Sequence, residues 1–109
     1  MRLLSPATVR WMTADHLGPR IPPAPTLGGS LIGAAGLGFG LGFAVRPTDG
    51  LQPVPGSAGD YFWGGYAGTA FWIDPKEALV VVFMVQVTGP VRGSHRNLLR
   101  QLVYQAITD

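Results

Sequence analysis

The serines of this 109-residue chain are the first place to look for an activated nucleophile. A lysine three positions after a serine would supply the base of an S-x-x-K pair, but no serine here has one, and the single lysine, Lys76, lies in an expected turn. Ser57 lies in the segment 55–59, which lacks the first glycine of G-x-S-x-G. No serine is therefore activated by a neighbour in the sequence. The serines are Ser5, Ser30, Ser57 and Ser94.

Histidines and carboxylates are the remaining groups that could move a proton or bind a metal. His16 falls in the last turn of an expected helix, where a cation suits the helix dipole, and His95 opens another helix. Neither has a partner at metal-ligand spacing, and no G-x-G-x-x-G is present, so we expect no metal and no cofactor. Most carboxylates suit turns or chain ends, and we expect Asp60 to be a solvated strand end.

The composition suits one modest domain with a packed core, and we treat 1–109 as a single partial domain. Charged residues make up 13% of the chain, and the net charge is +2. No basic patch is interleaved with aromatic side chains, so nucleic-acid binding is not expected. Because cysteine is absent, disulfides, thiolate metal sites and a cysteine nucleophile are excluded.

The stretch 21–45 carries no charge and lies between Arg20 and Arg46, so a membrane-spanning helix is one hypothesis. Three prolines crowd its start, and the glycines at alternate positions of 36–42 follow a strand period. We therefore expect no membrane span. The first six residues are too short an apolar run for a signal peptide, and the sequence assigns no compartment.

The hydrophobic pattern predicts two helices and about four strands. Ser5 and Pro6 suit a helix start, and Gly18 suits its end. The order of elements predicts an α+β fold, in which an antiparallel sheet of about four strands is flanked by an N-terminal and a C-terminal helix. The expected helices are 5–17 and 94–107, and the expected strands are 36–45, 60–65, 69–74 and 78–86.

Apolar patterns also predict how the last strand and the last helix pack. The continuous apolar run 79–85 is typical of a central strand covered on both faces. Ser94 is the expected cap of the last helix, and the apolar stripe of that helix should pack on the sheet. The stripe is Leu98, Leu99, Leu102, Val103, Ala106 and Ile107.

The segment 59–75 reads G-D-Y-F-W-G-G-Y-A-G-T-A-F-W-I-D-P. It resembles the strand–turn–strand block of the β-lactamase-related serine hydrolases, which include class C β-lactamases, DD-peptidases and esterases of the same fold. In the esterase-like branch, W-G-G or H-G-G replaces K-T-G, and A-G-T-x-F-W-x-D-P often follows. The resemblance extends to 3–6, 36–43 and 80–86, and it implies the C-terminal part of a β-lactamase/transpeptidase-like fold.

The resemblance implies a site for acyl transfer on the W-G-G strand. The N–H of Tyr66 would form half of an oxyanion hole, and Gly64 and Gly65 would leave room for substrate along the strand. Trp63 would take the place of the K-T-G lysine, and because it lacks a positive charge, the resemblance favours esters over β-lactams. Without the resemblance, the aromatic residues of this block are better explained as the core of a hairpin.

The resemblance also implies that the S-x-x-K pair and a catalytic tyrosine lie upstream of the region seen here. We therefore interpret the chain as the C-terminal fragment of an esterase-like serine hydrolase, acting on a small ester or amide, that lacks the nucleophile and is inactive alone. The alternative is a non-catalytic binding or self-assembly module that uses an open sheet edge. The expected partners are a homo-oligomer or a missing N-terminal segment, with no nucleic acid and no membrane.

Overall fold

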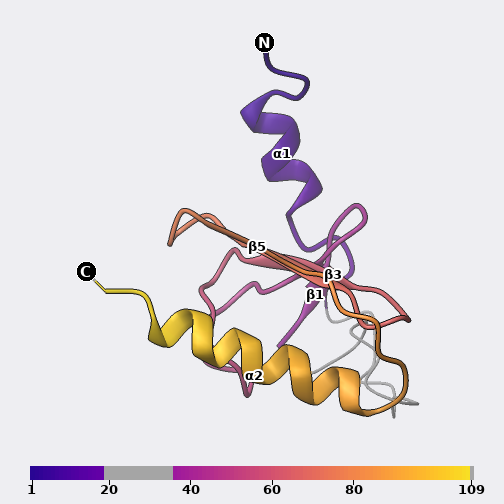
Figure 1. The fold of residues 1–109 in the computed structure, drawn as a ribbon. Coiled ribbons are helices and arrows are strands. Elements are labelled where there is room, and N and C mark those ends of the chain that lie inside the picture. The colour runs from indigo at the N-terminus through magenta and orange to yellow at the C-terminus, as the bar shows by residue number, and fades with distance from the viewer. Residues whose placement is uncertain (19–35, 109) are drawn as a thin grey trace.

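The computed structural model describes residues 1–18 and 36–108. In these residues the chain forms one five-stranded antiparallel sheet whose strands lie side by side in chain order. A short helix, α1, precedes the sheet and a long helix, α2, follows it and lies along one face (Figure 1). The predicted α+β class with a helix at each end is confirmed. The elements are α1 (Pro6–Met12), β1 (Gly38–Phe39), β2 (Ala44–Val45), β3 (Tyr61–Gly64), β4 (Ala70–Asp74), β5 (Leu79–Phe83) and α2 (Val91–Gln105).

The fifth strand arises because the segment predicted as one strand, 36–45, folds back on itself. Gly38 pairs with Val45, and the N–H of Gly40 donates to the carbonyl of Phe43 at 2.8 Å. Gly42 has a φ of +102°, a left-handed conformation that glycine adopts without strain. The prediction of a single strand over 36–45 was therefore wrong, because this segment forms a tight hairpin of β1 and β2.

The first helix starts as predicted but ends early. The Ser5 side chain accepts a hydrogen bond from the N–H of Thr8 at 3.1 Å, which satisfies one of the free amides at the helix start. After Met12 the chain turns toward β1, because the Asp15 carboxylate accepts from the N–H of Phe39 at 3.1 Å. Hydrogen bonds to a distant strand thus replace the last turn of the expected helix.

The three strands β3, β4 and β5 form the regular part of the sheet. Their register places Trp63, Phe71 and Val82 in one row, and Phe62, Trp72 and Val81 in the neighbouring row. Successive strand residues point to opposite faces, so these rows lie on opposite faces of the sheet. Trp72 is buried on the face that carries α2, where its ring stacks on Tyr104.

Two packing predictions were wrong. The apolar run of β5 was expected in the middle of the sheet, but β5 is an edge strand of the described sheet, and Val80, Val82 and Met84 are 64–76% exposed. In α2, Leu98 and Leu102 are more than half exposed. Leu99 and Val103 of the predicted stripe are half-buried, and the helix also turns Arg96, Arg100 and Tyr104 toward the sheet. It also begins at Val91, before the expected cap Ser94, and its N-cap residue is Pro90.

Across residues 1–18 and 36–108, no helix has the length and apolar character needed to cross a bilayer. The larger part of the uncharged stretch, 21–35, lies outside the described residues.

Candidate functional site

The turn between β3 and β4 holds the residue that the sequence singled out for an oxyanion hole. The N–H of Gly65 donates to the carbonyl of Thr69 at 2.8 Å, and the N–H of Gly68 donates to the carbonyl of Gly65 at 3.2 Å. Tyr66 follows Gly65 at the tip of this turn and is 79% exposed. Within the described part of the chain, no backbone carbonyl accepts a hydrogen bond from its N–H.

The two glycines before Tyr66 are each closely approached by one neighbour. A Cβ on Gly64 would lie 2.8 Å from the guanidinium carbon of Arg96, and a Cβ on Gly65 would overlap the hydroxyl of Thr69. A side chain at either position would therefore displace the neighbouring side chain, Arg96 or Thr69. Room for a substrate along the strand remains a prediction.

Trp63 lies on the face of the sheet opposite to α2, beside the β1–β2 hairpin. Its ring packs edge-on against Phe39 with 5.5 Å between ring centroids. It is half-buried and borders a shallow apolar hollow with Phe71, Val82 and Met84. Trp63 thus has a packing role in the hairpin that the sequence alone also allowed.

All four residues predicted for the site line one cavity. It has a volume of about 700 Å³, which is within the range of small-molecule sites. It lies between the sheet and the first half of α2, with the segment 52–54 also contributing. The four residues are Trp63, Gly64, Gly65 and Tyr66. These four residues are consecutive in the sequence, and the structure places them beside α2, which was not part of the predicted site.

Two arginines of α2 hold the β3–β4 turn from inside this cavity. Arg96 donates through Nη2 to the carbonyls of Gly65, at 2.5 Å, and Thr69, at 2.8 Å. Arg92 donates through Nη1 to the carbonyl of Tyr66 at 2.6 Å, and its guanidinium lies 4.9 Å from the centroid of the Tyr66 ring. Cation–π contacts of this kind add a modest attraction. The conformation of the turn is therefore coupled to α2.

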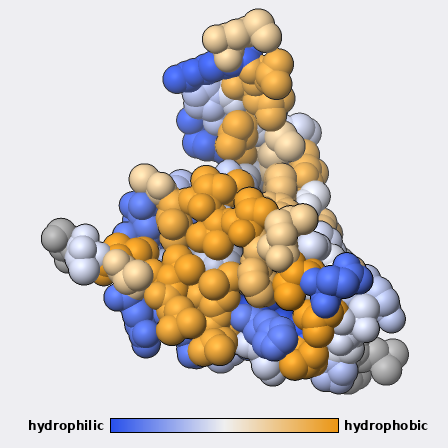
Figure 2. All heavy atoms as spheres, viewed as in Figure 1, coloured by the Kyte–Doolittle hydropathy of each residue, from blue (hydrophilic) through white to orange (hydrophobic). Residues whose placement is uncertain are grey.

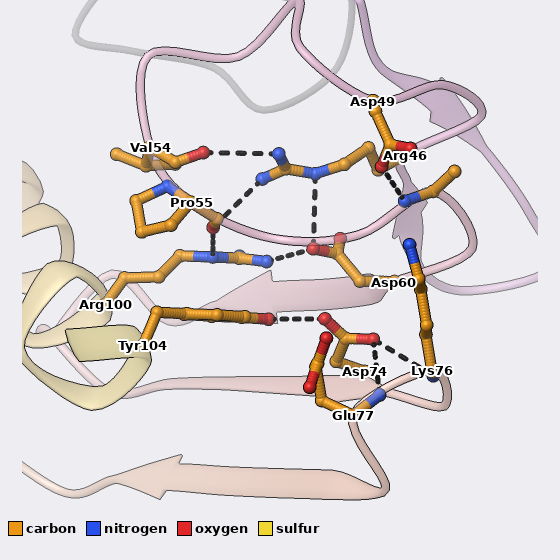
Figure 3. Close-up of polar contacts among 11 residues, drawn as sticks. Arg46, Asp49, Val54, Pro55, Asp60, Asp74, Lys76, Glu77, Arg100 and Tyr104 are labelled. Carbon is orange, nitrogen blue, oxygen red and sulfur yellow. Dashed lines mark hydrogen bonds and ion pairs between the residues drawn. The ribbon is translucent and has the colours of Figure 1, made fainter. Parts of the chain in front are cut away.

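A second group of charged residues is buried under the other half of α2 (Figure 3). Asp60 is fully buried, and its carboxylate contacts both Arg46, at 3.2 Å, and Arg100. Burial raises the pKa of Asp60, whereas the two guanidiniums oppose that change. The expectation that Asp60 is a solvated strand end was wrong, because Arg46 and Arg100 reach it from a loop and from α2.

The two arginines also bind backbone carbonyls of the loop before β3. Arg100 donates through Nε to the carbonyl of Pro55 at 2.7 Å, and Arg46 donates to the carbonyl of Val54 at 3.2 Å (Figure 3). The group therefore fastens strand β2, the loop and α2 together. We assign it a structural role.

Tyr104 and Asp74 form a third contact between α2 and the sheet. The Tyr104 hydroxyl donates to Asp74 Oδ2 at 2.7 Å (Figure 3), and the other Asp74 oxygen accepts from the N–H groups of Lys76 and Glu77. Burial alone would raise the pKa of Asp74, but hydrogen bonds from Tyr104, Ser57 and the turn amides lower it overall. Burial and the bond to Asp74 raise the pKa of Tyr104. Asp74 thus lies in a turn, as expected for most of the carboxylates, and the sequence did not predict its contact with Tyr104.

The inward-facing residues of α2 recur every fourth position and could have been found in the sequence. They are Arg92, Arg96, Arg100 and Tyr104. Residues four apart share a helix face, but arginines on an amphipathic helix usually mark the solvent side. The histidines take no part in these contacts: His16 bonds the carbonyl of Trp11 at 2.7 Å and His95 is exposed. No three His, Asp or Glu side chains within the described ranges gather as a metal site requires.

Comparisons with known proteins give a consistent result. The family described as "Beta-lactamase" matches residues 2–105. Two proteins of Mycobacterium tuberculosis, the uncharacterized protein MT1414 of strain CDC 1551 / Oshkosh and the protein Rv1367c of strain ATCC 25618 / H37Rv, are each 33% identical over 88 residues. Each match covers 79% of this chain but only 22% of the relative. The chain therefore spans about a fifth of the length of the curated relatives it matches.

The solved structures of simvastatin synthase (LovD) from Aspergillus terreus have the same arrangement of elements. The unliganded selenomethionyl form superimposes with a TM-score of 0.75 at 25% identity, over 98% of this chain and 30% of that chain. A second unliganded form gives 0.69 at 27% identity, over 95% of this chain and 30% of that chain. The LovD6 mutant superimposes with a TM-score of 0.68 at 26% identity, over 94% of this chain and 29% of that chain.

Proposed function

The chain belongs to the β-lactamase family, and we propose that it supplies one wall of the active site of an esterase-like serine hydrolase. The observation that carries this proposal is the N–H of Tyr66, which donates to no backbone carbonyl of the described residues and lies beside a cavity that Trp63, Gly64 and Gly65 also line. A backbone donor held in a hydrogen-bonded turn, beside a cavity of ligand size, suits the stabilisation of an oxyanion.

The serines that the structure describes have structural surroundings rather than a catalytic base. Ser5 caps α1, Ser57 is buried and bonds Asp74, and Ser94 is exposed on α2. Ser30 lies outside the described residues and has no lysine three positions later. In our proposal, a segment other than residues 1–109 supplies the nucleophile, and this chain alone is inactive.

In the proposed reaction, the serine oxygen gives its proton to a base of the segment that supplies it and attacks the carbonyl carbon of an ester or amide, and the π electrons of the C=O bond move to the oxygen. When the C=O bond re-forms, the bond to the alcohol or amine breaks, and this leaving group takes the proton from the base. The Tyr66 N–H would donate a hydrogen bond to the oxygen, on which negative charge develops in the transition state. Loss of one such donor typically lowers kcat by about 10²–10³-fold. Gly65 and Thr69 hold the turn, so the donor needs little reorganisation when the charge develops.

Removal of the Tyr66 N–H alone tests the proposal. Tyr66→Pro deletes this donor at a turn position that proline tolerates, whereas Tyr66→Ala keeps the donor and removes the ring. Each variant is joined to the part of protein Rv1367c that the chain does not match, and hydrolysis of p-nitrophenyl butyrate is measured. We expect Tyr66→Pro to lose about 10²–10³-fold in kcat and Tyr66→Ala to stay within a few fold.

The chain alone provides the second arm of this test. We expect no turnover of p-nitrophenyl butyrate above background and no labelling by a fluorophosphonate. Turnover by the pure chain that one serine substitution abolishes would refute the proposal, as would equal activity of the proline and alanine variants in the joined protein.

One observation favours a second candidate function, a self-assembly module. The strand β5 lies at an edge of the described sheet, and its exposed side chains are apolar. Figure 2 shows apolar side chains gathered over the region of β5 and α2 that faces the viewer. Such an edge can pair with a strand of another polypeptide, here a second copy of the chain. Light scattering after size exclusion would then give a dimer, and a monomer at high concentration would count against this function.

A further inference from the structure

The Tyr66 N–H and the Gly65 carbonyl belong to the same peptide group of the β3–β4 turn. Arg96 donates through Nη2 to this carbonyl at 2.5 Å, and the N–H of Gly68 donates to it at 3.2 Å. The Gly65 oxygen thus accepts two hydrogen bonds, one of them from a cation. A hydrogen bond at the carbonyl end of a peptide group draws electron density away from its N–H, which becomes a stronger donor. Arg96 is therefore placed to strengthen the proposed oxyanion donor through its own peptide bond.

The guanidinium of Arg96 is held close to this peptide. The same Nη2 also donates to the carbonyl of Thr69 at 2.8 Å, which lies across the turn from Gly65. The guanidinium packs against the backbone of Gly64, where a Cβ would lie 2.8 Å from its carbon. The first glycine of W-G-G therefore leaves the room that Arg96 needs to reach the turn.

The positive charge of Arg96 acts on neutral groups. Among the described residues, Arg96 forms no ion pair, and it donates to the carbonyls of Gly65 and Thr69. Arginine keeps its proton in proteins, and a hydrogen bond from a charged donor is roughly twice as strong as one from a neutral donor. No carboxylate of the described residues neutralises this guanidinium, so its charge polarises the peptide that it contacts.

Arg92 gives an internal comparison, because it contacts the next peptide group of the same turn. Its Nη1 donates to the carbonyl of Tyr66 at 2.6 Å, and the N–H of that peptide belongs to Ala67. Both arginines come from α2 and carry the same charge. Of the two, Arg96 is the one that contacts the peptide holding the Tyr66 N–H.

We propose that Arg96 is a positioning residue for the Tyr66 N–H, which it orients and strengthens as a donor through the Gly65 carbonyl. This role in catalysis rests on the proposed function. The hydrogen bond from Arg96 fixes the plane of the Gly65–Tyr66 peptide and hence the direction of its N–H. A donor that is aimed before charge develops needs no reorganisation in the transition state. Arg96 should therefore affect kcat more than KM.

The effect of Arg96 on the peptide is measured in the full 109-residue chain by nuclear magnetic resonance. We expect Arg96→Met to move the carbonyl carbon of Gly65 and the amide nitrogen of Tyr66 to lower frequency, because loss of a hydrogen bond at a carbonyl shifts both nuclei in that direction. Arg92→Met should instead move the carbonyl carbon of Tyr66 and the amide nitrogen of Ala67. Shifts of the same nuclei in both variants, or no shift in Arg96→Met, would overturn the proposal.

The Gly65 N–H reports whether the turn survives the substitution, since it donates to the Thr69 carbonyl at 2.8 Å. Its hydrogen exchange should stay slow in Arg96→Met. Gly64→Ala is a second variant, because its Cβ would displace the guanidinium while Arg96 is retained, and it should shift the same two nuclei. Arg96→Lys keeps the charge and should restore part of the wild-type shifts. If Arg96→Met unfolds, Gly64→Ala and Arg96→Lys decide.

Kinetics in the protein joined to the unmatched part of Rv1367c test the role in catalysis. We expect Arg96→Met to lower kcat for p-nitrophenyl butyrate by about two- to ten-fold and to leave KM nearly unchanged. The loss is smaller than that of Tyr66→Pro because the donor is weakened rather than removed. Arg10→Gln, which removes the same charge from the exposed end of α1, should leave both constants unchanged. An equal loss of kcat in Arg10→Gln would mean that only the net charge matters.

A double variant shows whether Arg96 acts through Tyr66. Once Tyr66→Pro has removed the N–H, Arg96→Met should cause no further loss of kcat, and losses that multiply would refute the positioning role. If Tyr66→Pro keeps full activity while Arg96→Met still shifts the two nuclei, the proposed function fails and the effect of Arg96 on the peptide stands. If Tyr66→Pro loses activity and Arg96→Met does not, the proposed function stands and the positioning role fails.

Discussion

The two faces of the sheet are held in opposite ways. The face under α2 buries Asp60, Asp74 and Trp72, and charged or hydroxyl groups of the helix reach all three. The opposite face presents Val80 and Val82 to solvent at β5. Charged residues are therefore buried beside Trp72 on one face, whereas large apolar side chains are exposed on the other, which departs from the usual distribution.

This difference shows that specific polar contacts bind α2 to the sheet, beside the half-buried Leu99 and Val103 of its apolar stripe. Buried ion pairs depend strongly on geometry, since removal of one partner leaves the other charge without compensation. An apolar face is less demanding, and any polypeptide of suitable shape could cover it. The covered face should thus be sensitive to single substitutions, and the open face should tolerate them.

The largest expected effect comes from Asp60→Asn. The substitution removes the carboxylate shared by Arg46 and Arg100 and leaves two guanidiniums buried without a counter-charge. We expect the free energy of unfolding to fall by about 3–5 kcal/mol, measured by urea denaturation. Glu77→Gln, at an exposed turn position, is the control and should change it by less than about 0.5 kcal/mol. A loss below 1 kcal/mol in Asp60→Asn would show that the buried group is not needed.

Next in size is Tyr104→Phe, which removes the hydroxyl bonded to Asp74. A hydrogen bond to a charged group contributes about 1.5–3 kcal/mol, and we expect a loss of that order in the same urea assay. Tyr66→Phe, which changes an exposed ring on the turn, should have no effect. If both variants lose the same amount, the Asp74 contact is not what stabilises α2.

Two lysine substitutions on one strand compare the faces directly. Val81 lies in the row of Trp72, under α2, and Val82 lies in the row of Phe71, on the open face. We expect Val81→Lys to cost about 1–3 kcal/mol and Val82→Lys less than about 0.5 kcal/mol. Val82→Lys should also convert a dimer formed through β5 into a monomer in light scattering. If both variants lost a similar amount of the free energy of unfolding, the open face would have to be covered in solution.

The smallest effect concerns pH. Hydrogen bonds hold the pKa of Asp74 below its ordinary value of 3.8 in the folded protein. The stability that this contributes is present above pH 3.8 and is lost as the pH falls through the folded-state value. Urea denaturation between pH 5 and pH 2 should show this loss, and it should be smaller in Tyr104→Phe because the pKa of Asp74 is then less depressed. An unchanged pH dependence in that variant would contradict the assignment.

Local signals predicted most of the elements. Ser5 accepts from the N–H of Thr8, and Asp74 accepts from the N–H groups of Lys76 and Glu77, so residue types at short spacing were sufficient for this helix start and this turn. The hairpin of β1 and β2 was missed because alternating glycines suit a strand and a tight turn equally well. Asp60 was misplaced because its partners, Arg46 and Arg100, lie 14 and 40 residues away in the sequence.

The sequence by itself determined the fold class, the family resemblance and the absence of a serine–lysine pair, because each depends on residue type at short spacing. Only the tertiary structure decided which face of α2 meets the sheet and which face of β5 is left open. A periodic pattern identifies the faces of an element but not their partners. Ion pairs between residues far apart in the sequence determine which faces meet. Here these are the pairs of Asp60 with Arg46 and Arg100.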